Sequence, residues 1–117
     1  MTEEIRIFHN PRCSKCRLTM EILNDKGINA SVVKYLETPP DSQELSSVLE
    51  MLGLEPRELM RKHETPYTEN DLDNPDLSRE QLIQAMIDNP ILIERPIVIN
   101  GDKATIGRPP EKVLDIL

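Results

Sequence analysis

The sequence predicts an α/β protein whose elements follow the order β-α-β, then a helical segment, then β-β-α. Three observations indicate this order. A short apolar strand at residues 5–8 precedes an amphipathic helix and a second strand, helical apolar spacing runs through about residues 41–90, and two short strands flank an Asn-Gly turn near the end. We therefore expect a single domain over residues 1–117, with an all-helical insertion at about 41–90.

The opening third of the chain contains the first strand, a helix and the second strand. Between residues 14 and 26, apolar side chains recur at i, i+4 and i+7, and two more widen the stripe: Cys16, Met20 and Leu23, with Leu18 and Ile22. Gly27 follows as a helix stop, because glycine readily adopts the left-handed conformation there. Val32, Val33 and Tyr35 predict the second strand.

The middle of the chain has helix start and stop signals. Asp41 offers an N-cap with Glu44 three residues on, and Gly53 ends the apolar stripe that follows. A short helix is expected to begin at Pro56 and to continue over residues 57–62, followed by a polar loop over 64–75. A Ser-x-x-Gln capping box at residues 78–81 starts another helix, which ends at Pro90.

The end of the chain predicts a hairpin and a last helix. Residues 96–99 form an apolar strand, and residues 104–106 return as its partner. Asn100, Gly101 and Asp102 are expected to form the turn, with Asn-Gly at its two central positions because this pair readily takes positive φ at both. Pro109 and Pro110 then start a helix. This is the element order of thioredoxin, so the predicted fold class is thioredoxin-like with a helical insertion.

Composition and charge limit the classes of partner. The net charge of −7 repels phosphate backbones and anionic lipids, so nucleic acid and membrane are not expected as partners. The chain contains no run of 18 apolar residues, and its acidic start, Met1 to Glu4, is unlike a secretory signal. We expect a cytoplasmic protein. Its two cysteines would then rarely form a structural disulfide.

Cys13 is the candidate nucleophile. It lies between the first strand and the first helix, where unpaired backbone N–H groups and the positive end of the helix dipole stabilise a thiolate. Arg12, Lys15 and Arg17 add positive charge nearby. Such surroundings lower a thiol pKa from about 8.5 to roughly 3.5–7.5, which matters because the thiolate is the reactive form. Cys-x-x-Cys within a β-α-β pattern is typical of a redox motif.

The two cysteines allow two other interpretations. Zinc binding would require four ligands, and only His9 and His63 could join the two cysteines, so no metal site is expected. Cys16 falls on the apolar stripe of its helix, so it could simply be a small buried residue. The packing reading does not extend to Cys13, because a cysteine at a turn end flanked by arginine and lysine is an odd choice for packing.

Three arginines lie in suggestive places: Arg61 after a short helix, Arg95 before Pro96, and Arg108 before Pro109. An arginine chosen at random is usually solvated or salt-bridged at the surface. Spacing alone does not show that these three converge.

Several motifs then extend over nearly the whole chain: His9-Asn10-Pro11-x-Cys13, Tyr35-Leu36-Glu37-x-Pro39-Pro40, Glu58 to Lys62, Gln81 to Ile83, Asn89 to Ile93, Arg95 to Val98, Arg108-Pro109 and Val113 to Leu117. In this order and spacing, the chain resembles the ArsC family of glutaredoxin-dependent arsenate reductases. Within that family it is most similar to the short bacterial ArsC-like members.

The resemblance implies reduction of arsenate to arsenite. Cys13 would attack arsenate, His9 would help lower its pKa, and Arg61, Arg95 and Arg108 would hold the oxyanion. Arginine forks suit such tetrahedral anions. Glutathione would be a co-substrate, glutaredoxin would complete the electron transfer, and no bound cofactor is expected. Pro96 matches the proline that thioredoxin-like folds place in cis before a strand facing the site.

One departure concerns Cys16, because the plasmid-type reductases have serine at that position. Cys16, together with Asn10 and Arg17, is a candidate supporting group for Cys13, or Cys16 could resolve a Cys13 adduct as a disulfide. The second option would favour thioredoxin or another dithiol donor. The alternatives to arsenate reduction are an Spx-like redox-sensing regulator and a general thiol-disulfide oxidoreductase. The His-Asn-Pro before Cys13 and the Arg-Pro-Pro from Arg108 are typical of the reductases.

Overall fold

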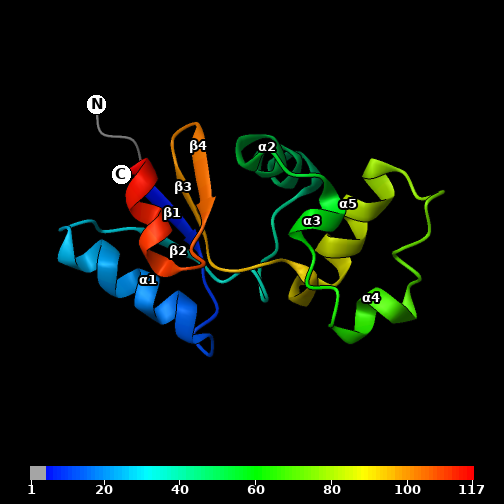
Figure 1. Cartoon of the computed structure of the whole chain (residues 1–117), viewed down its shortest axis with the longest axis horizontal. Coiled ribbons are helices and arrows are strands. Elements are labelled where there is room, and N and C mark those ends of the chain that lie inside the picture. Colours follow the sequence, from blue (N-terminus) through cyan, green and yellow to red (C-terminus); the bar gives the residue numbers. More distant parts are fainter. Residues whose placement is uncertain (1–4) are drawn as a thin grey trace. The chain divides into compact units, whose positions relative to one another are not determined.

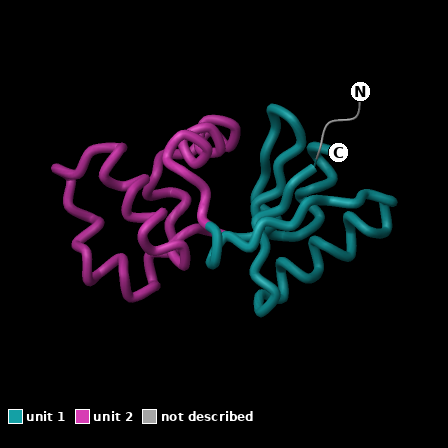
Figure 2. Tube along the Cα trace, turned by 180° about the vertical axis from the view of Figure 1, so that it is seen from behind, with its two compact units in different colours: residues 1–38, 95–117 teal, residues 39–94 magenta. Residues whose placement is uncertain are grey.

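The computed structural model describes residues 5–117, so the acidic start of the chain lies outside the described part. Two compact units are distinguished by their internal contacts (Figure 2). The first comprises the chain up to residue 38 together with residues 95–117, and the second comprises residues 39–94. The helices of the middle segment all belong to the second unit, and the sheet belongs to the first.

The first unit is built on a four-stranded sheet in the order β2-β1-β3-β4. The strands are β1 (Ile5–Phe8), β2 (Ser31–Val33), β3 (Ile97–Asn100) and β4 (Lys103–Ile106). β1 and β2 are parallel, whereas β3 runs antiparallel to both β1 and β4. Helix α1 (Ser14–Asp25) connects β1 to β2, and the 3₁₀ helix η2 (Pro110–Ile116) follows β4 (Figure 1). The thioredoxin-like α/β class predicted from the element order is confirmed.

The core of the first unit lies between one face of the sheet and the two helices α1 and η2. Ile7 and Val98 are partners across β1 and β3, and they pack with Leu23 of α1 and Val113 of η2. All four side chains are fully buried. This packing fixes α1, and therefore its first turn, against the sheet.

The buried face of α1 differs in detail from the predicted stripe. Cys16 and Leu23 are buried, but Thr19 is buried with them and Leu18 is 45% exposed. Each helical residue advances about 100°, so Cys16, Thr19 and Leu23 fall within about 60° on one face while Leu18 points away. The Thr19 hydroxyl is satisfied within the helix, since it donates to the Lys15 carbonyl at 2.8 Å. The predicted stop at Gly27 is confirmed by its φ of 73°.

Two predicted features of the sheet were wrong in detail. The second strand ends at Val33, and Tyr35 lies beyond it, where its N–H bonds back to the Val33 carbonyl at 2.9 Å. In the hairpin, Asn100 is still a strand residue paired with Lys103. The central turn positions are therefore Gly101, with a φ of 63°, and Asp102, which corresponds to glycine first in a type II′ turn. The register of the strands decides which residues turn.

The second unit contains α2 (Ser42–Leu52), α3 (Pro56–Leu59), α4 (Thr65–Glu69), α5 (Arg79–Asp88) and the 3₁₀ helix η1 (Pro90–Leu92). Its predicted caps are confirmed. The Asp41 carboxylate accepts the Glu44 N–H at 2.8 Å, and Gly53 ends α2 with a φ of 69°. Ser78 and Gln81 form the expected reciprocal capping box at the start of α5.

Two predictions for the second unit were wrong. The helix from Pro56 does not continue to residue 62, because the chain instead pairs Met60 with Ile93 in an isolated β-bridge. The predicted loop over residues 64–75 contains α4. This region is tied down by the Arg57 guanidinium, which donates to the carbonyl groups of Leu72 and Asn74. The first difference comes from a tertiary contact that local sequence patterns do not report.

Candidate active site

Four chain segments lie at one end of the sheet. β1 ends at Phe8, parallel β2 ends beside it, and antiparallel β3 begins with Ile97, the partner of Phe8. β4 ends at Ile106, which pairs with Ile97. The residues that immediately follow or precede these positions therefore leave the sheet at the same end: the loop with His9, Asn10 and Cys13, the turn with Tyr35, and the segments with Arg95 and Arg108.

Cys13 occupies the N-cap position of α1. Its N–H donates to the Asn10 carbonyl at 2.9 Å, and its own carbonyl accepts the N–H of Arg17 at 3.1 Å. Asn10 further shapes the loop, because its side-chain oxygen accepts the Arg12 N–H at 3.0 Å. Cys13 is 8% exposed, so it is mostly buried. The predicted placement of Cys13 at the helix start is confirmed.

The surroundings of Cys13 stabilise its thiolate. Burial raises the pKa of Cys13, but hydrogen bonds from the Cys16 N–H, the Arg95 side chain, the Cys16 thiol and the Lys15 N–H together outweigh this effect. The net pKa is below the ordinary thiol value. The Cys16 and Lys15 contributions come from backbone groups of the first helical turn, as a helix N-terminus provides. The positive charge comes from Arg95, a residue distant in sequence.

Arg12, Lys15 and Arg17 are the neighbouring cations that the sequence predicted to lower the Cys13 pKa by their charge. Arg17 donates from Nη1 to the Pro11 carbonyl at 3.0 Å, so it braces the loop. Arg12 is exposed. Lys15 acts on Cys13 through its backbone N–H. The proximity of basic residues in sequence was therefore a poor guide to which charge reaches the sulfur.

Arg108 contacts both Cys13 and the Arg95 backbone. Its Nη2 atom lies 3.8 Å from Cys13 Sγ, and its Nε donates to the Arg95 carbonyl at 2.7 Å. The Arg95–Pro96 and Arg108–Pro109 peptide bonds are both cis. The structure thus brings together Cys13, Arg95 and Arg108, whose convergence the sequence alone did not show.

Gly107 makes this arrangement possible. Its N–H donates to the Pro96 carbonyl at 2.9 Å. A Cβ atom at this position would lie 2.7 Å from Thr19 Oγ1 and 2.8 Å from Pro96 Cγ, closer than real side chains approach. The absence of a side chain therefore lets the Arg108 segment lie against α1 and Pro96.

Cys16 is fully buried beside Cys13. The Asn10 N–H points at its sulfur across 3.5 Å. Burial is the main reason that the pKa of Cys16 is raised to about 11, so this thiol stays protonated at neutral pH. A protonated Cys16 can donate a hydrogen bond to the Cys13 thiolate, which is one of several contacts that lower the Cys13 pKa.

His9 lies at the start of the loop, and its backbone N–H donates to the Val33 carbonyl at 2.9 Å. Its Nδ1 atom is buried and has no hydrogen-bond partner among residues 5–117. Burial and the positive charge of Arg17 lower the pKa of His9, so the ring is neutral at pH 7. The expected help of His9 in lowering the Cys13 pKa stays a prediction.

Arg61 belongs to the second unit. Its guanidinium bonds to Glu64 at 3.2 Å and to Glu94 at 3.0 Å, and its Nη2 lies 3.1 Å from His63 Nε2. Its backbone N–H donates to the Leu92 carbonyl at 2.7 Å. These contacts hold the side chain within its own unit. Its expected role in holding an oxyanion stays a prediction.

The family model described as the ArsC family matches residues 8–116 of this chain. The chain belongs to the ArsC family. The uncharacterized protein YfgD of Escherichia coli (strain K12) is 53% identical to it, over 100% of this chain and 99% of the relative. An arsenate reductase of Neisseria meningitidis serogroup A is 50% identical, over 97% of this chain and 98% of the relative. The solved structure of an arsenate reductase from Vibrio cholerae is 47% identical and superimposes with a TM-score of 0.95, each chain being covered completely.

In this ArsC-family chain, the first unit by itself brings a thiol of lowered pKa and two guanidinium groups together at a helix start. Arginine forks bind tetrahedral oxyanions through paired hydrogen bonds, and their charge offsets the repulsion between an anionic nucleophile and an anionic electrophile. Within the described residues, no three side chains of the His, Cys, Asp and Glu types are grouped to hold a metal ion. No helix over residues 5–117 is long and apolar enough to span a membrane.

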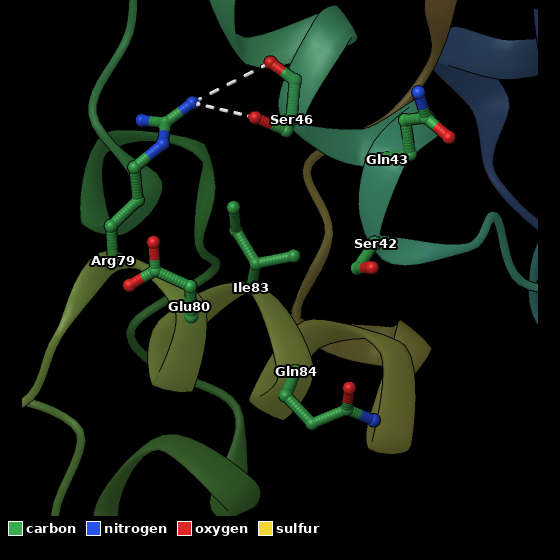
Figure 3. A pocket seen from close by; sticks show the side chains of 7 residues that line it. All are labelled: Ser42, Gln43, Ser46, Arg79, Glu80, Ile83 and Gln84. Carbon is green, nitrogen blue, oxygen red and sulfur yellow. Dashed lines mark hydrogen bonds between the residues drawn. The ribbon is translucent and has the colours of Figure 1, made fainter.

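A hollow lies in the other unit, between α2 and α5. Its walls are shown in Figure 3: Ser42, Gln43, Ser46, Arg79, Glu80, Ile83 and Gln84. The Arg79 guanidinium is turned onto Ser46, where Nη2 donates to the hydroxyl at 3.1 Å (Figure 3). This contact links the two helices. The hollow contains no nucleophile comparable to Cys13.

Sequence reasoning missed two residues of the ArsC-family site. The sequence pattern places Tyr35 in a strand. A usable signal was that the chain has only two tyrosines and that this one directly follows a strand. Gly107 directly precedes Arg108, and an isolated glycine at a strand end indicates close backbone approach. The part that each residue plays depends on its neighbours in the folded chain, which are Arg95 for Tyr35 and Pro96 and Thr19 for Gly107.

Proposed function

We propose that this chain reduces arsenate to arsenite with Cys13 as the nucleophile. The observation that carries the proposal is the guanidinium of Arg108 at 3.8 Å from the Cys13 sulfur, beside a thiol whose pKa is lowered. Arsenate is a tetrahedral oxyanion, and a thiolate attacks it only if cations offset the repulsion between like charges. The ArsC-family membership and the similarity to arsenate reductases support the choice of arsenate among oxyanions.

The proposed chemistry begins with a covalent adduct. The Cys13 thiolate attacks arsenic(V), an S–As bond forms, and one As–O bond breaks as that oxygen takes up protons and leaves as water. Arg95 and Arg108 hold the remaining oxygens. Arg61 is proposed as a third ligand of the oxyanion, and His9 as a further influence on the Cys13 thiolate. No bound cofactor takes part in this scheme.

Glutathione is proposed as the reductant of the adduct. Its thiolate attacks the Cys13 sulfur, so an S–S bond forms and the S–As bond breaks with its electron pair left on arsenic. Arsenic thereby gains two electrons and leaves as arsenite, while the two sulfurs are oxidised to a mixed disulfide. Glutaredoxin then reduces this disulfide by thiol–disulfide exchange. Such donors are abundant in the reducing cytoplasm, where we propose that the protein acts.

Cys16 offers a second route for the same two electrons. If the Cys16 thiolate attacked the Cys13 sulfur of the adduct, the product would be a Cys13–Cys16 disulfide, and a dithiol protein such as thioredoxin would restore the enzyme. The closeness of the two thiols favours this route, but the pKa of Cys16, raised to about 11, opposes it because the thiolate is scarce at neutral pH. We therefore propose Cys16 as a hydrogen-bond donor to Cys13.

The test is a coupled assay of arsenate-dependent NADPH oxidation. It is run once with glutathione, glutaredoxin and glutathione reductase, and once with thioredoxin and thioredoxin reductase. We expect turnover with the first donor system and its abolition by Cys13→Ser. Turnover with thioredoxin alone would assign the dithiol route. No arsenate-dependent oxidation with either system would overturn the proposal.

A further inference from the structure

The hydroxyl of Tyr35 is buried and makes no well-aligned hydrogen bond in the described part of the chain. Its side chain is fully buried, and its Oη atom is one of the few buried polar atoms in that position. An unsatisfied buried hydroxyl is costly, and a phenylalanine would fill the same space without that cost. We therefore expect the hydroxyl to serve a neighbouring polar group of the site.

The ring of Tyr35 is fixed at the end of the sheet where the Cys13 loop begins. One carbonyl, that of Val33, accepts the N–H of Tyr35 and the N–H of His9, both at 2.9 Å. The ring stacks on Phe8, the last residue of β1, with centroids 6.3 Å apart and planes inclined by 23°. The hydroxyl is thus held on a rigid base and cannot swing to solvent.

Arg95 is the neighbour that this hydroxyl can serve. Burial raises the pKa of Tyr35 to about 12, the two thiols add to this rise, and the positive charge of Arg95 and a side-chain hydrogen bond with Arg95 oppose it. The phenol is therefore neutral at physiological pH, with oxygen lone pairs available. Arginine has five N–H donors and no acceptor, so a phenolic oxygen is a complementary partner for one of them.

We propose that Tyr35 is a positioning residue for Arg95: its hydroxyl oxygen accepts one guanidinium N–H and so aims the remaining donors at the Cys13 sulfur and at an oxyanion bound there. Arginine has a long side chain with many rotamers, and an aimed fork loses less freedom when it binds. The Arg95 carbonyl is already held by Arg108 Nε at 2.7 Å. Arg108 therefore fixes the backbone of Arg95, and Tyr35 would fix its side chain. The oxyanion part of the inference rests on the proposed function.

The first experiment compares the full-length protein with Tyr35→Phe, which keeps the ring, its stacking and its volume. We would measure the pH midpoint of iodoacetamide alkylation of Cys13, the protection of Cys13 by inorganic phosphate, and the Tm. We expect an upward shift of the midpoint, about tenfold weaker protection by phosphate, and a Tm that is unchanged or higher. Tyr67→Phe, at the chain's other tyrosine in α4, is the matched control and should match the wild type in all three.

The second experiment asks whether Tyr35 acts through Arg95. In an Arg95→Lys background, the added Tyr35→Phe change should have no further effect on the midpoint or on protection, because no fork remains to be aimed. A full additional effect in that background would overturn the inference. So would a Tyr35→Phe protein that lowers the Tm but leaves both Cys13 readouts unchanged, since the hydroxyl would then be structural.

The two readouts also separate this inference from the proposed function. If neither phosphate nor arsenate protects wild-type Cys13, the oxyanion site is refuted, and the oxyanion part of the inference fails with it. The pH midpoint of Cys13 alkylation, in contrast, is measured in the absence of any oxyanion. An unchanged midpoint in Tyr35→Phe would refute the positioning of Arg95 toward Cys13, even in an active arsenate reductase.

Discussion

The Nη2 atom of Arg108 lies 3.8 Å from the Sγ atom of Cys13, across 95 positions of sequence. The same guanidinium donates from Nε to the Arg95 carbonyl at 2.7 Å. One arginine therefore joins the candidate nucleophile to the segment that carries a second arginine. This bridge depends on the planar fork of arginine, whose donors point in fixed, separate directions.

Replacing Arg108 with lysine should break this bridge while keeping the charge. A single ammonium does not reproduce both contacts, so we expect kcat/KM for arsenate to fall about 10- to 100-fold, or about 1.4–2.7 kcal/mol of transition-state stabilisation. Steady-state kinetics in the coupled assay measures this. Arg79→Lys, an arginine that contacts Ser46 in the second unit, is the control. Equal kinetics for Arg108→Lys and wild type would contradict the assignment of Arg108.

The pH dependence of Cys13 reactivity follows from its lowered pKa. Above that pKa the thiolate predominates and alkylation is fast, and as the pH falls through it the sulfur is protonated and the rate declines. We expect a midpoint clearly below the free-thiol value when the rate of iodoacetamide modification is plotted against pH. Cys16 is fully buried and should remain unmodified. A midpoint at or above about 8.5 would refute the thiolate assignment.

Substitutions of Cys16 should separate hydrogen bonding from disulfide formation. Cys16→Ser keeps a donor to Cys13, so glutathione-linked activity should stay within about tenfold of wild type, or about 1.4 kcal/mol. Cys16→Ala removes the donor, so the Cys13 pKa should rise and the activity lost at neutral pH should return at higher pH. Complete inactivity of Cys16→Ser at every pH would instead make the Cys13–Cys16 disulfide an obligatory intermediate.

Gly107→Ala should damage both stability and the site. The new Cβ would meet Thr19 Oγ1 at 2.7 Å and Pro96 Cγ at 2.8 Å, so the Arg108 segment must move. We expect a loss of about 1–3 kcal/mol in the free energy of unfolding, measured by urea titration, and a higher alkylation midpoint for Cys13. Gly27→Ala is a useful comparison, because its φ of 73° is strained for alanine but its Cβ meets nothing within 4 Å. It should lower stability without changing the Cys13 midpoint.

Arg61→Ala tests the arginine of the second unit. If Arg61 holds the oxyanion, the KM for arsenate should rise about tenfold or more, with little change in the alkylation midpoint of the free enzyme. If instead Arg61 only links Glu64 and Glu94, the change should lower stability and leave the KM unaltered. Glu64→Gln provides the comparison, since it weakens the ion pair and keeps the arginine. Wild-type KM in Arg61→Ala would remove this residue from the site.

Local signals in the sequence predicted the start and end of most elements. Asp41, Gly53 and the Ser78–Gln81 box act through contacts within three or four residues, so the chain determines them without its tertiary surroundings. The end of α3 was missed because it depends on a partner far along the chain, since Met60 pairs with Ile93. The existence of α4 was missed although it has a local signal, Pro66 in its first turn.

By itself, the sequence determined the thioredoxin-like order of elements and the place of Cys13 at a helix start, because periodicity, caps and turns are local properties. The tertiary structure alone decided which cations reach the sulfur. Arg12 and Arg17 are close to Cys13 in sequence, but the latter donates to the Pro11 carbonyl. Arg95 and Arg108 reach Cys13 because strand pairing sets which ends of β1, β3 and β4 coincide, and no local pattern encodes that register.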